Sequence, residues 1–298
     1  MAYRLGIDLG FARNRYQEPE VWTKIVREEF GLGYVSMIAD IFNPVWPKEY
    51  LKKLIERTKE NIDKYDIKIE ACFSSAQTRL PHFTNPDKEM REFYFQWYKD
   101  FFSMMSEFGC RIGGSNFGIY SFTDYENEDR RKFLLEEAVK AWQKMSFFVQ
   151  DLGFEYLTFE PMSVPREMGN TVAECKELMD MINCNCGVPM KICLDVGHAP
   201  HPSERDPYYW MEGLGADSPF IHLQQTVLNS SNHSPFTREF NETGIIDAER
   251  TINTLRKTGL EDALFALEIS HREHYDTEFR IIDDLKESVE YWRPYIKE

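Results

Sequence analysis

Residues 156–161 read Tyr-Leu-Thr-Phe-Glu-Pro, and residues 191–195 read Lys-Ile-Cys-Leu-Asp. Each stretch is a short apolar run that is rich in strand-forming residues, bounded by Gly or Pro, and ended by a carboxylate. Between them, residues 171–185 place apolar side chains three or four positions apart with charges between, which is typical of an amphipathic helix. The pattern predicts a strand–helix–strand unit in which the two strands are parallel.

The same rhythm extends over the whole chain. Helical periodicity is clear in residues 132–149, where Leu134, Ala138, Trp142, Met145 and Val149 share one face. The predicted strands are Tyr3–Leu9, Tyr34–Asp40, Ile67–Ser74, Arg111–Phe117, Tyr156–Pro161, Lys191–Asp195, Phe220–Gln225 and Leu264–Ser270. The main predicted helices are Pro47–Tyr65, Asp87–Phe108, Asp129–Gly153, Thr171–Asn185 and Thr277–Tyr295.

Eight strand–helix units divide the 298 residues into segments of about 37 residues, which is the length that a (β/α)8 TIM barrel needs. A doubly wound sheet is the alternative α/β architecture, but the first strand is not followed by a Gly-x-Gly-x-x-Gly turn. No Pro-, Gly- or Ser-rich linker and no internal repeat divides the chain. We therefore predict one catalytic barrel domain that spans residues 1–298.

Composition limits the partners of the chain. The 35 Lys and Arg against 50 Asp and Glu give a net charge of −15, which disfavours binding to nucleic acid and to anionic membrane surfaces. No run of about 18 apolar residues predicts a membrane span, and the N-terminus does not resemble a signal peptide. The six cysteines are scattered in a chain too large to need disulfides. These features predict a cytoplasmic protein.

The last polar residue of each of the final four strands is a candidate for chemistry. These residues are Glu160, Asp195, His222 and Glu268. Because the carboxyl ends of barrel strands form the active site, the four side chains are expected to converge there and bind a divalent cation. Three carboxylates and one imidazole favour Mn²⁺, with Mg²⁺ or Co²⁺ as alternatives. For any single acid, the simpler interpretation is a buried ion pair with a Lys or Arg.

This pattern resembles the xylose isomerase-like family of sugar and sugar-phosphate isomerases and epimerases, including the D-tagatose 3-epimerase type. The matching segments are Phe159–Pro161, Leu194–His198, Ile221–Leu223 and Leu267–Glu268, together with Gly244–Asp247 and Leu255–Leu260. They cover the C-terminal half, whereas the N-terminal half matches in its strand–helix rhythm and in Leu5–Asp8. Residues 9–12 and 161–167 also resemble the branch that acts on tetrulose phosphates.

The resemblance implies that Glu160, Asp195, His222 and Glu268 hold the metal. A ketose would chelate the cation through a hydroxyl and the adjacent carbonyl, which would stabilise the enediolate formed when a proton is lost. Glu160 and Glu268 would remove and return the proton on different sides of the carbon, and His198 would bind the substrate and donate to its carbonyl oxygen. Analogy with the family also implies a homodimer or homotetramer.

The chain departs from the epimerases of free ketoses at two places. The acid that follows the first metal glutamate in those enzymes is replaced by Arg166, followed by Glu167, and the arginine that usually follows the seventh-strand histidine is missing. A guanidinium at this position favours an anionic substrate group such as phosphate, so Arg166 and Glu167 are candidate substrate-binding residues. The alternative is a surface ion pair of Arg166 with Glu167 or Glu174. The irregular segment 225–243 follows the seventh strand and is expected to lie over the mouth of the barrel, with His233 as a further candidate.

The sequence therefore predicts a metal-dependent isomerase or 3-epimerase of a small ketose or ketose phosphate with four to six carbons. A decarboxylase or carbon–carbon lyase acting on an oxidised sugar acid would use the same site and is the main alternative. A nuclease for abasic DNA is disfavoured, because the chain has only 7 His and a net charge of −15. A catalytically inactive sugar-binding protein is the non-enzymatic alternative. The sequence does not determine the sugar, its phosphorylation or the metal.

Overall fold

The eight predicted strands form a closed parallel barrel in which each strand pairs with its neighbours in sequence and β1 pairs with β8. A computed structural model describes residues 2–75, 82–162, 164–199, 203–273 and 276–296. The strands are β1 (Ala2–Asp8), β2 (Tyr34–Ile38), β3 (Lys68–Phe73), β4 (Ile112–Ser115), β5 (Tyr156–Phe159), β6 (Met190–Asp195), β7 (Phe220–Leu223) and β8 (Asp262–Leu267). The single-domain (β/α)8 barrel that the sequence predicts is confirmed.

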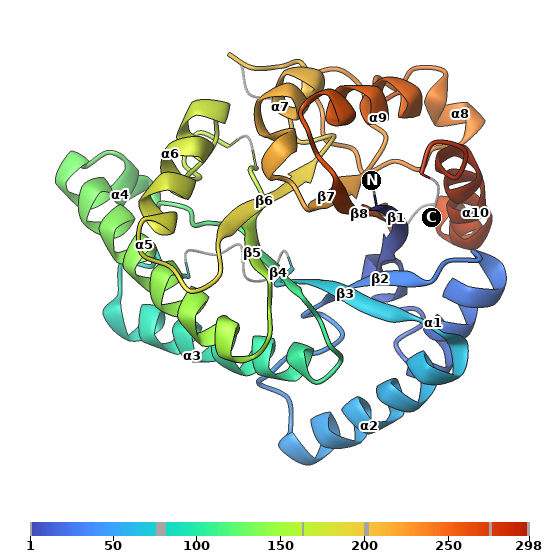
Figure 1. The fold of residues 1–298 in the computed structure, drawn as a ribbon, viewed down its shortest axis with the longest axis horizontal. Coiled ribbons are helices and arrows are strands. Elements are labelled where there is room, and N and C mark those ends of the chain that lie inside the picture. The colour runs from blue at the N-terminus through green and yellow to red at the C-terminus, as the bar shows by residue number, and fades with distance from the viewer. Residues whose placement is uncertain (1, 76–81, 163, 200–202, 274–275, 297–298) are drawn as a thin grey trace.

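Helices surround the strands on the outside of the barrel (Figure 1). The longest, α5, begins after Asn127, whose side chain accepts a hydrogen bond from the backbone N–H of Arg130. The helices are α1 (Pro19–Lys24), α2 (Lys48–Tyr65), α3 (Lys88–Ser106), α4 (Phe122–Tyr125), α5 (Glu128–Asp151), α6 (Val172–Asn183), α7 (Pro207–Leu214), α8 (Arg238–Asn241), α9 (Ala248–Lys257) and α10 (Ile281–Trp292). Shorter helical turns lie at Leu9–Ala12, Ile25–Glu29, Gly215–Asp217 and Asp276–Arg280.

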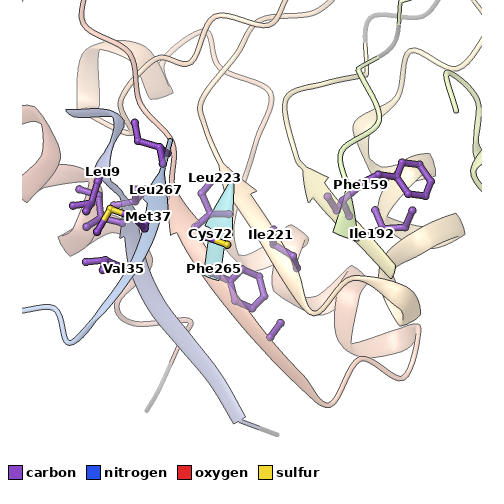
Figure 2. Packing of buried hydrophobic residues seen from close by; sticks show 14 of the residues in the cluster. Leu9, Val35, Met37, Cys72, Phe159, Ile192, Ile221, Leu223, Phe265 and Leu267 are labelled. Atoms are coloured by element: carbon purple, nitrogen blue, oxygen red, sulfur yellow. The ribbon is translucent and has the colours of Figure 1, made fainter. Parts of the chain in front are cut away.

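The strands divide the core into two layers, because alternate side chains of a strand point to opposite faces. The outward-facing layer packs beneath the helices, and the strand register places Phe159 beside Ile192 and Leu223 beside Leu267 (Figure 2). A separate buried cluster fills the inside of the barrel. Its members are Ala71, Phe73, Ile112, Cys193, Phe220, Leu264 and Ala266.

The predicted segments differ from the observed ones mainly at their ends. The last strand was predicted as Leu264–Ser270 but runs from Asp262 to Leu267, and the last helix begins at Ile281 after a 3-10 turn. Beyond Leu267 the chain leaves the sheet, and the N–H of Ser270 donates to the carbonyl of His233 over 2.9 Å. The apolar run therefore continues past the strand because it anchors the loop above the barrel.

Within the described ranges, no helix combines the length and the apolar character that crossing a membrane requires.

Candidate metal centre and active site

Strand geometry brings four side chains to one point at the carboxyl end of the barrel. Asp195 is the last residue of β6, His222 lies within β7, and Glu160 and Glu268 directly follow β5 and β8. Each lies two residues beyond an inward-facing member of the strand, such as Cys193 before Asp195 and Phe220 before His222. The two-residue period therefore directs all four side chains into the barrel.

The four side chains are close enough to share one ligand. One nitrogen or oxygen from each of Glu160, Asp195, His222 and Glu268 lies within 4.8 Å of the corresponding atoms of the others. His222 Nδ1 is 2.9 Å from Glu160 Oε1 and 3.1 Å from Glu268 Oε2. Glu268 Oε2 is buried and has no hydrogen-bond partner of good geometry. The predicted convergence of the four residues is observed, and an unsatisfied buried oxygen faces their centre.

Among the described residues, no lysine or arginine pairs with these acids. Within the described part of the chain, the ion pairs of Glu160, Asp195 and Glu268 are formed with histidines alone. The simpler interpretation of each acid, a buried pair with Lys or Arg, therefore does not describe this cluster. Two buried carboxylates and the half-buried Glu268 are costly to hold together unless a ligand of positive charge joins them. The donor set fits a divalent cation.

The groups of the cluster perturb one another electrostatically. Burial alone would lower the pKa of His222, but the charges of Cys193, Glu268 and Glu160 outweigh it and raise this pKa well above its usual value. Burial raises the pKa of Asp195. Burial would also raise the pKa of Glu268, but the positive charge of His222 dominates and lowers it.

Gln224 holds the cluster in place from the end of β7. Its Nε2 donates to both carboxylate oxygens of Asp195, at 3.0 and 2.9 Å, and its Oε1 accepts from the N–H of His233 at 2.6 Å. Gly197 gives Gln224 the necessary room, since a Cβ there would lie 2.5 Å from the amide carbon. The N–H of Gly197 also donates to Asp195 at 2.6 Å. The residues around Asp195 therefore fix its orientation before any ligand binds.

A cavity of about 250 Å³ opens above the cluster. Its volume is below the range of about 300–1,000 Å³ typical of drug-sized ligands, so it suits a small substrate. The lining residues that matter for chemistry are Asp8, Arg13, Asp40, Glu160, His198, His233 and Glu268. Both predicted proton-transfer carboxylates therefore face the same small space.

Two predicted substrate-binding histidines also line this cavity. His198 follows β6, and its Nδ1 lies 3.6 Å from Glu160 Oε1. His233 lies on the segment after β7, where Gln225 and Ser234 form a short antiparallel bridge. The Nε2 atoms of the two histidines are 3.2 Å apart. Segment 225–243 thus places one histidine over the mouth of the barrel, as the sequence analysis expected.

Arg166 and Glu167 lie elsewhere. The Arg166 guanidinium donates to the carbonyl of Tyr120 and stacks 4.2 Å from the ring of Phe122, and neither Arg166 nor Glu167 is among the described residues that line the catalytic cavity. The expected surface pair with Glu167 or Glu174 is also not among the ion pairs of the described residues. This placement does not support the prediction that Arg166 anchors an anionic substrate group, because its guanidinium contacts the segment after β4 instead.

The catalytic cavity is also lined by Asp8, Arg13 and Asp40, from the first half of the barrel, which were not predicted as site residues. Asp8 ends β1 and Asp40 follows β2, so the rule that identified Glu160 would have found both if applied to the early strands. Burial and the nearby Glu268 raise the pKa of Asp8 to about 7. The rule of polar residues at strand ends would not have identified Arg13, because it lies in the irregular loop beyond the first helical turn.

Comparison with known proteins gives three consistent findings. Residues 27–295 match the family described as xylose isomerase-like TIM barrel. The chain is 29% identical to D-erythrulose 1-phosphate 3-epimerase from Brucella abortus, over 99% of this chain and 97% of that protein. It superimposes on a putative xylose isomerase from Rhodospirillum rubrum with a TM-score of 0.88 and 25% identity, covering 98% of each chain.

A more distant solved structure shares the fold. D-psicose 3-epimerase from Clostridium cellulolyticum, in a complex with D-tagatose, has a TM-score of 0.66 and 15% identity, covering 97% of this chain and 90% of that one. At this level of identity the likeness concerns the barrel and its strand order.

Proposed function

The chain belongs to the xylose isomerase-like TIM barrel family, and from this premise we propose that it is a divalent-metal-dependent 3-epimerase of a short ketose phosphate. It is an enzyme of the sugar isomerase and epimerase class. The observation that carries the proposal is that Glu160 and Glu268 face one small cavity from the ends of β5 and β8 and form, with Asp195 and His222, a cluster whose acids have no Lys or Arg partner among the described residues.

Glu160, Asp195, His222 and Glu268 would hold the cation. Their oxygen-rich donor set, with one imidazole, favours Mn²⁺, and Mg²⁺ or Co²⁺ would also be accepted. When bound, the cation would supply positive charge next to the substrate oxygens on which negative charge develops. The buried Oε2 of Glu268 and the absence of any Lys or Arg partner within the described residues support this assignment.

The two glutamates provide the proton transfers. One carboxylate removes the proton from the carbon beside the ketose carbonyl, and the other delivers a proton to the opposite face, which inverts that carbon. Glu160 and Glu268 line the same cavity, and one oxygen of each lies within 4.8 Å of the other, so one small substrate can contact both. His198, which lines the same cavity, donates a hydrogen bond to the carbonyl oxygen as its charge grows.

The substrate is proposed from size and similarity. The cavity of about 250 Å³ has room for about eight water molecules at ~30 Å³ each, which suits a sugar of four carbons better than a longer one. The relative from Brucella abortus bears the name of a tetrulose-phosphate 3-epimerase, and its similarity extends over the whole chain. A phosphorylated tetrulose is therefore the first substrate to test.

Two further properties belong to the same proposal. All six cysteines are free thiols, which is consistent with a reducing cytoplasm. We also propose that the protein is a homodimer or homotetramer, by analogy with the family. Size-exclusion chromatography with light scattering measures the assembly, and a monomer would contradict that part of the proposal.

Exchange with heavy water tests the reaction. The purified protein is loaded with Mn²⁺ and incubated in D₂O with tetruloses to hexuloses, free and phosphorylated. We expect deuterium at C3, inversion of that carbon and no loss of carbon atoms, because one C–H bond breaks and one C–D bond forms. Release of carbon dioxide from an oxidised sugar acid incubated in parallel, without exchange into any ketose, would instead indicate the decarboxylase. Exchange at C1 and C2 with formation of an aldose would indicate an isomerase.

A further inference from the structure

The catalytic cavity adjoins a second, more open cavity of about 590 Å³ on the outer side of the barrel mouth. The two cavities share Arg13, Arg15, His233, Ser270 and His271 as lining residues. A substrate bound over the metal cluster can therefore extend one end outward past these residues.

The outer cavity has a charge opposite to that of the protein as a whole. It is lined by three arginines (residues 13, 15 and 272) and by one glutamate, Glu273, although the chain has a net charge of −15. Glu273 already accepts a hydrogen bond from Asn14 at 3.1 Å. A positive rim next to an acidic catalytic floor favours a ligand whose outer end is anionic.

The arginines differ in how strongly the protein already uses them. Arg15 donates to the carbonyl of His271 at 2.6 Å and to Glu278 at 3.1 Å. Among the described residues, Arg13 makes one long ion pair, 3.7 Å from Asp40, and its side chain is 42% exposed. Its donors are therefore available to a ligand, and Arg15 is a fixed positive charge beside them.

We propose that Arg13 binds the phosphate of the substrate and selects phosphorylated ketoses over free ones. This inference rests on the proposed epimerase function. A phosphate on a terminal carbon is only a few atoms from the carbon that is epimerised, so its partner must line the same cavity as Glu160 and Glu268, as Arg13 does. A planar guanidinium is suited to binding two phosphate oxygens at once.

Two neighbours of Arg13, Asp40 and Asn14, bear on the position of its guanidinium. Asp40, whose side chain is buried, lines the same cavity 3.7 Å from Arg13, and Asp40 Oδ2 has no hydrogen-bond partner among the described residues. Asn14, between the two arginines, adopts the left-handed conformation with φ 61°, which turns the chain at this point.

The test compares Arg13→Met with Arg166→Met, which removes the same charge from the arginine outside the cavity. For the Mn²⁺-loaded protein, we expect Arg13→Met to raise KM for a tetrulose phosphate by about 10- to 100-fold and to leave kinetics with the free tetrulose within about threefold of wild type. Arg166→Met should keep the wild-type preference for the phosphorylated sugar. An equal effect of Arg13→Met on both sugars, or a selective effect of Arg166→Met, would overturn the inference.

A binding measurement separates this inference from the reaction itself. Calorimetric titration of metal-free protein compares glycerol 3-phosphate with glycerol, and wild type should bind the phosphate ester more tightly, with a loss of about 10-fold or more in Arg13→Met. If no ketose is epimerised, the proposed function fails and this titration still decides the role of Arg13. Equal binding by wild type and variant would refute it.

A second variant tests whether Arg13→Met lowers phosphate binding only because it disturbs the fold. Arg13→Met leaves the buried Asp40 without a cation, so the double variant Arg13→Met/Asp40→Asn is measured in parallel. It should melt at the wild-type temperature and still bind glycerol 3-phosphate weakly. Wild-type affinity in the double variant would count against Arg13.

Discussion

The two ends of the barrel bury acidic side chains in opposite ways. At the amino end of the strands, the nearly buried Glu70 of β3 lies 2.7 Å from Arg4 and 2.9 Å from Arg111. At the carboxyl end, Glu160 and Glu268 have only histidine partners among the described residues. A buried acid with arginines around it stabilises the fold, whereas buried acids without a fixed cation keep a place for a ligand.

The largest effect on activity is expected from Glu268→Gln at the carboxyl end of the barrel. The substitution keeps the size of the side chain and removes one proton-transfer group, so turnover of the tetrulose phosphate should fall by about 100- to 10,000-fold. Circular dichroism should show an unchanged fold. Wild-type activity of this variant would exclude the two-carboxylate reaction.

Gln224→Met tests whether the carboxyl end is organised for a cation before one binds. The variant removes both hydrogen bonds to Asp195, and Mn²⁺ affinity should fall by about 10- to 100-fold in a calorimetric titration. The matched control is Gln225→Met, since Gln225 donates to Asn241 and Ile246 instead. An equal loss of affinity in both variants would show that the loop, and not the contact with Asp195, is responsible.

Glu70→Gln makes the corresponding change at the amino end. It leaves Arg4 and Arg111 without their shared carboxylate, and the free energy of unfolding should fall by about 2 kcal/mol in urea denaturation. The kcat of the remaining folded protein should equal that of wild type. A large loss of kcat would mean that the two ends are not separate in function.

Asp8→Asn tests how much a buried acid at the carboxyl end lowers the stability of the metal-free protein, because this cost changes with pH. The folded pKa of Asp8 is about 7 against an ordinary 3.8, because burial and then Glu268 disfavour its charge. The unfolded chain releases this proton first, so Asp8 costs the metal-free protein stability as pH rises from about 4 to about 7. At pH 8 the free energy of unfolding of Asp8→Asn should therefore exceed that of wild type by up to about 4 kcal/mol, and at pH 4 the two should differ little. A variant less stable than wild type at pH 8 would contradict this electrostatic cost.

The fold and the four-residue cluster were predictable because both depend on short-range periods. The two-residue period of a strand places Asp195 and His222 on the inward face, two residues beyond Cys193 and Phe220, and the carboxyl ends of parallel strands in a barrel meet at one mouth. Predicted strand ends were less accurate, as at Leu267, where the apolar run continues into a loop that is anchored to His233.

The sequence by itself determined the barrel, its order of strands and helices, and which acids and histidine gather at its mouth. Only the tertiary structure decided which arginine faces the cavity, placing Arg13 there and Arg166 against Tyr120 and Phe122. It also revealed Gln224 as the link between Asp195 and His233. The physical reason is that a strand fixes the direction of its side chains by a two-residue period, whereas a loop directs each side chain through contacts with residues far away in the sequence.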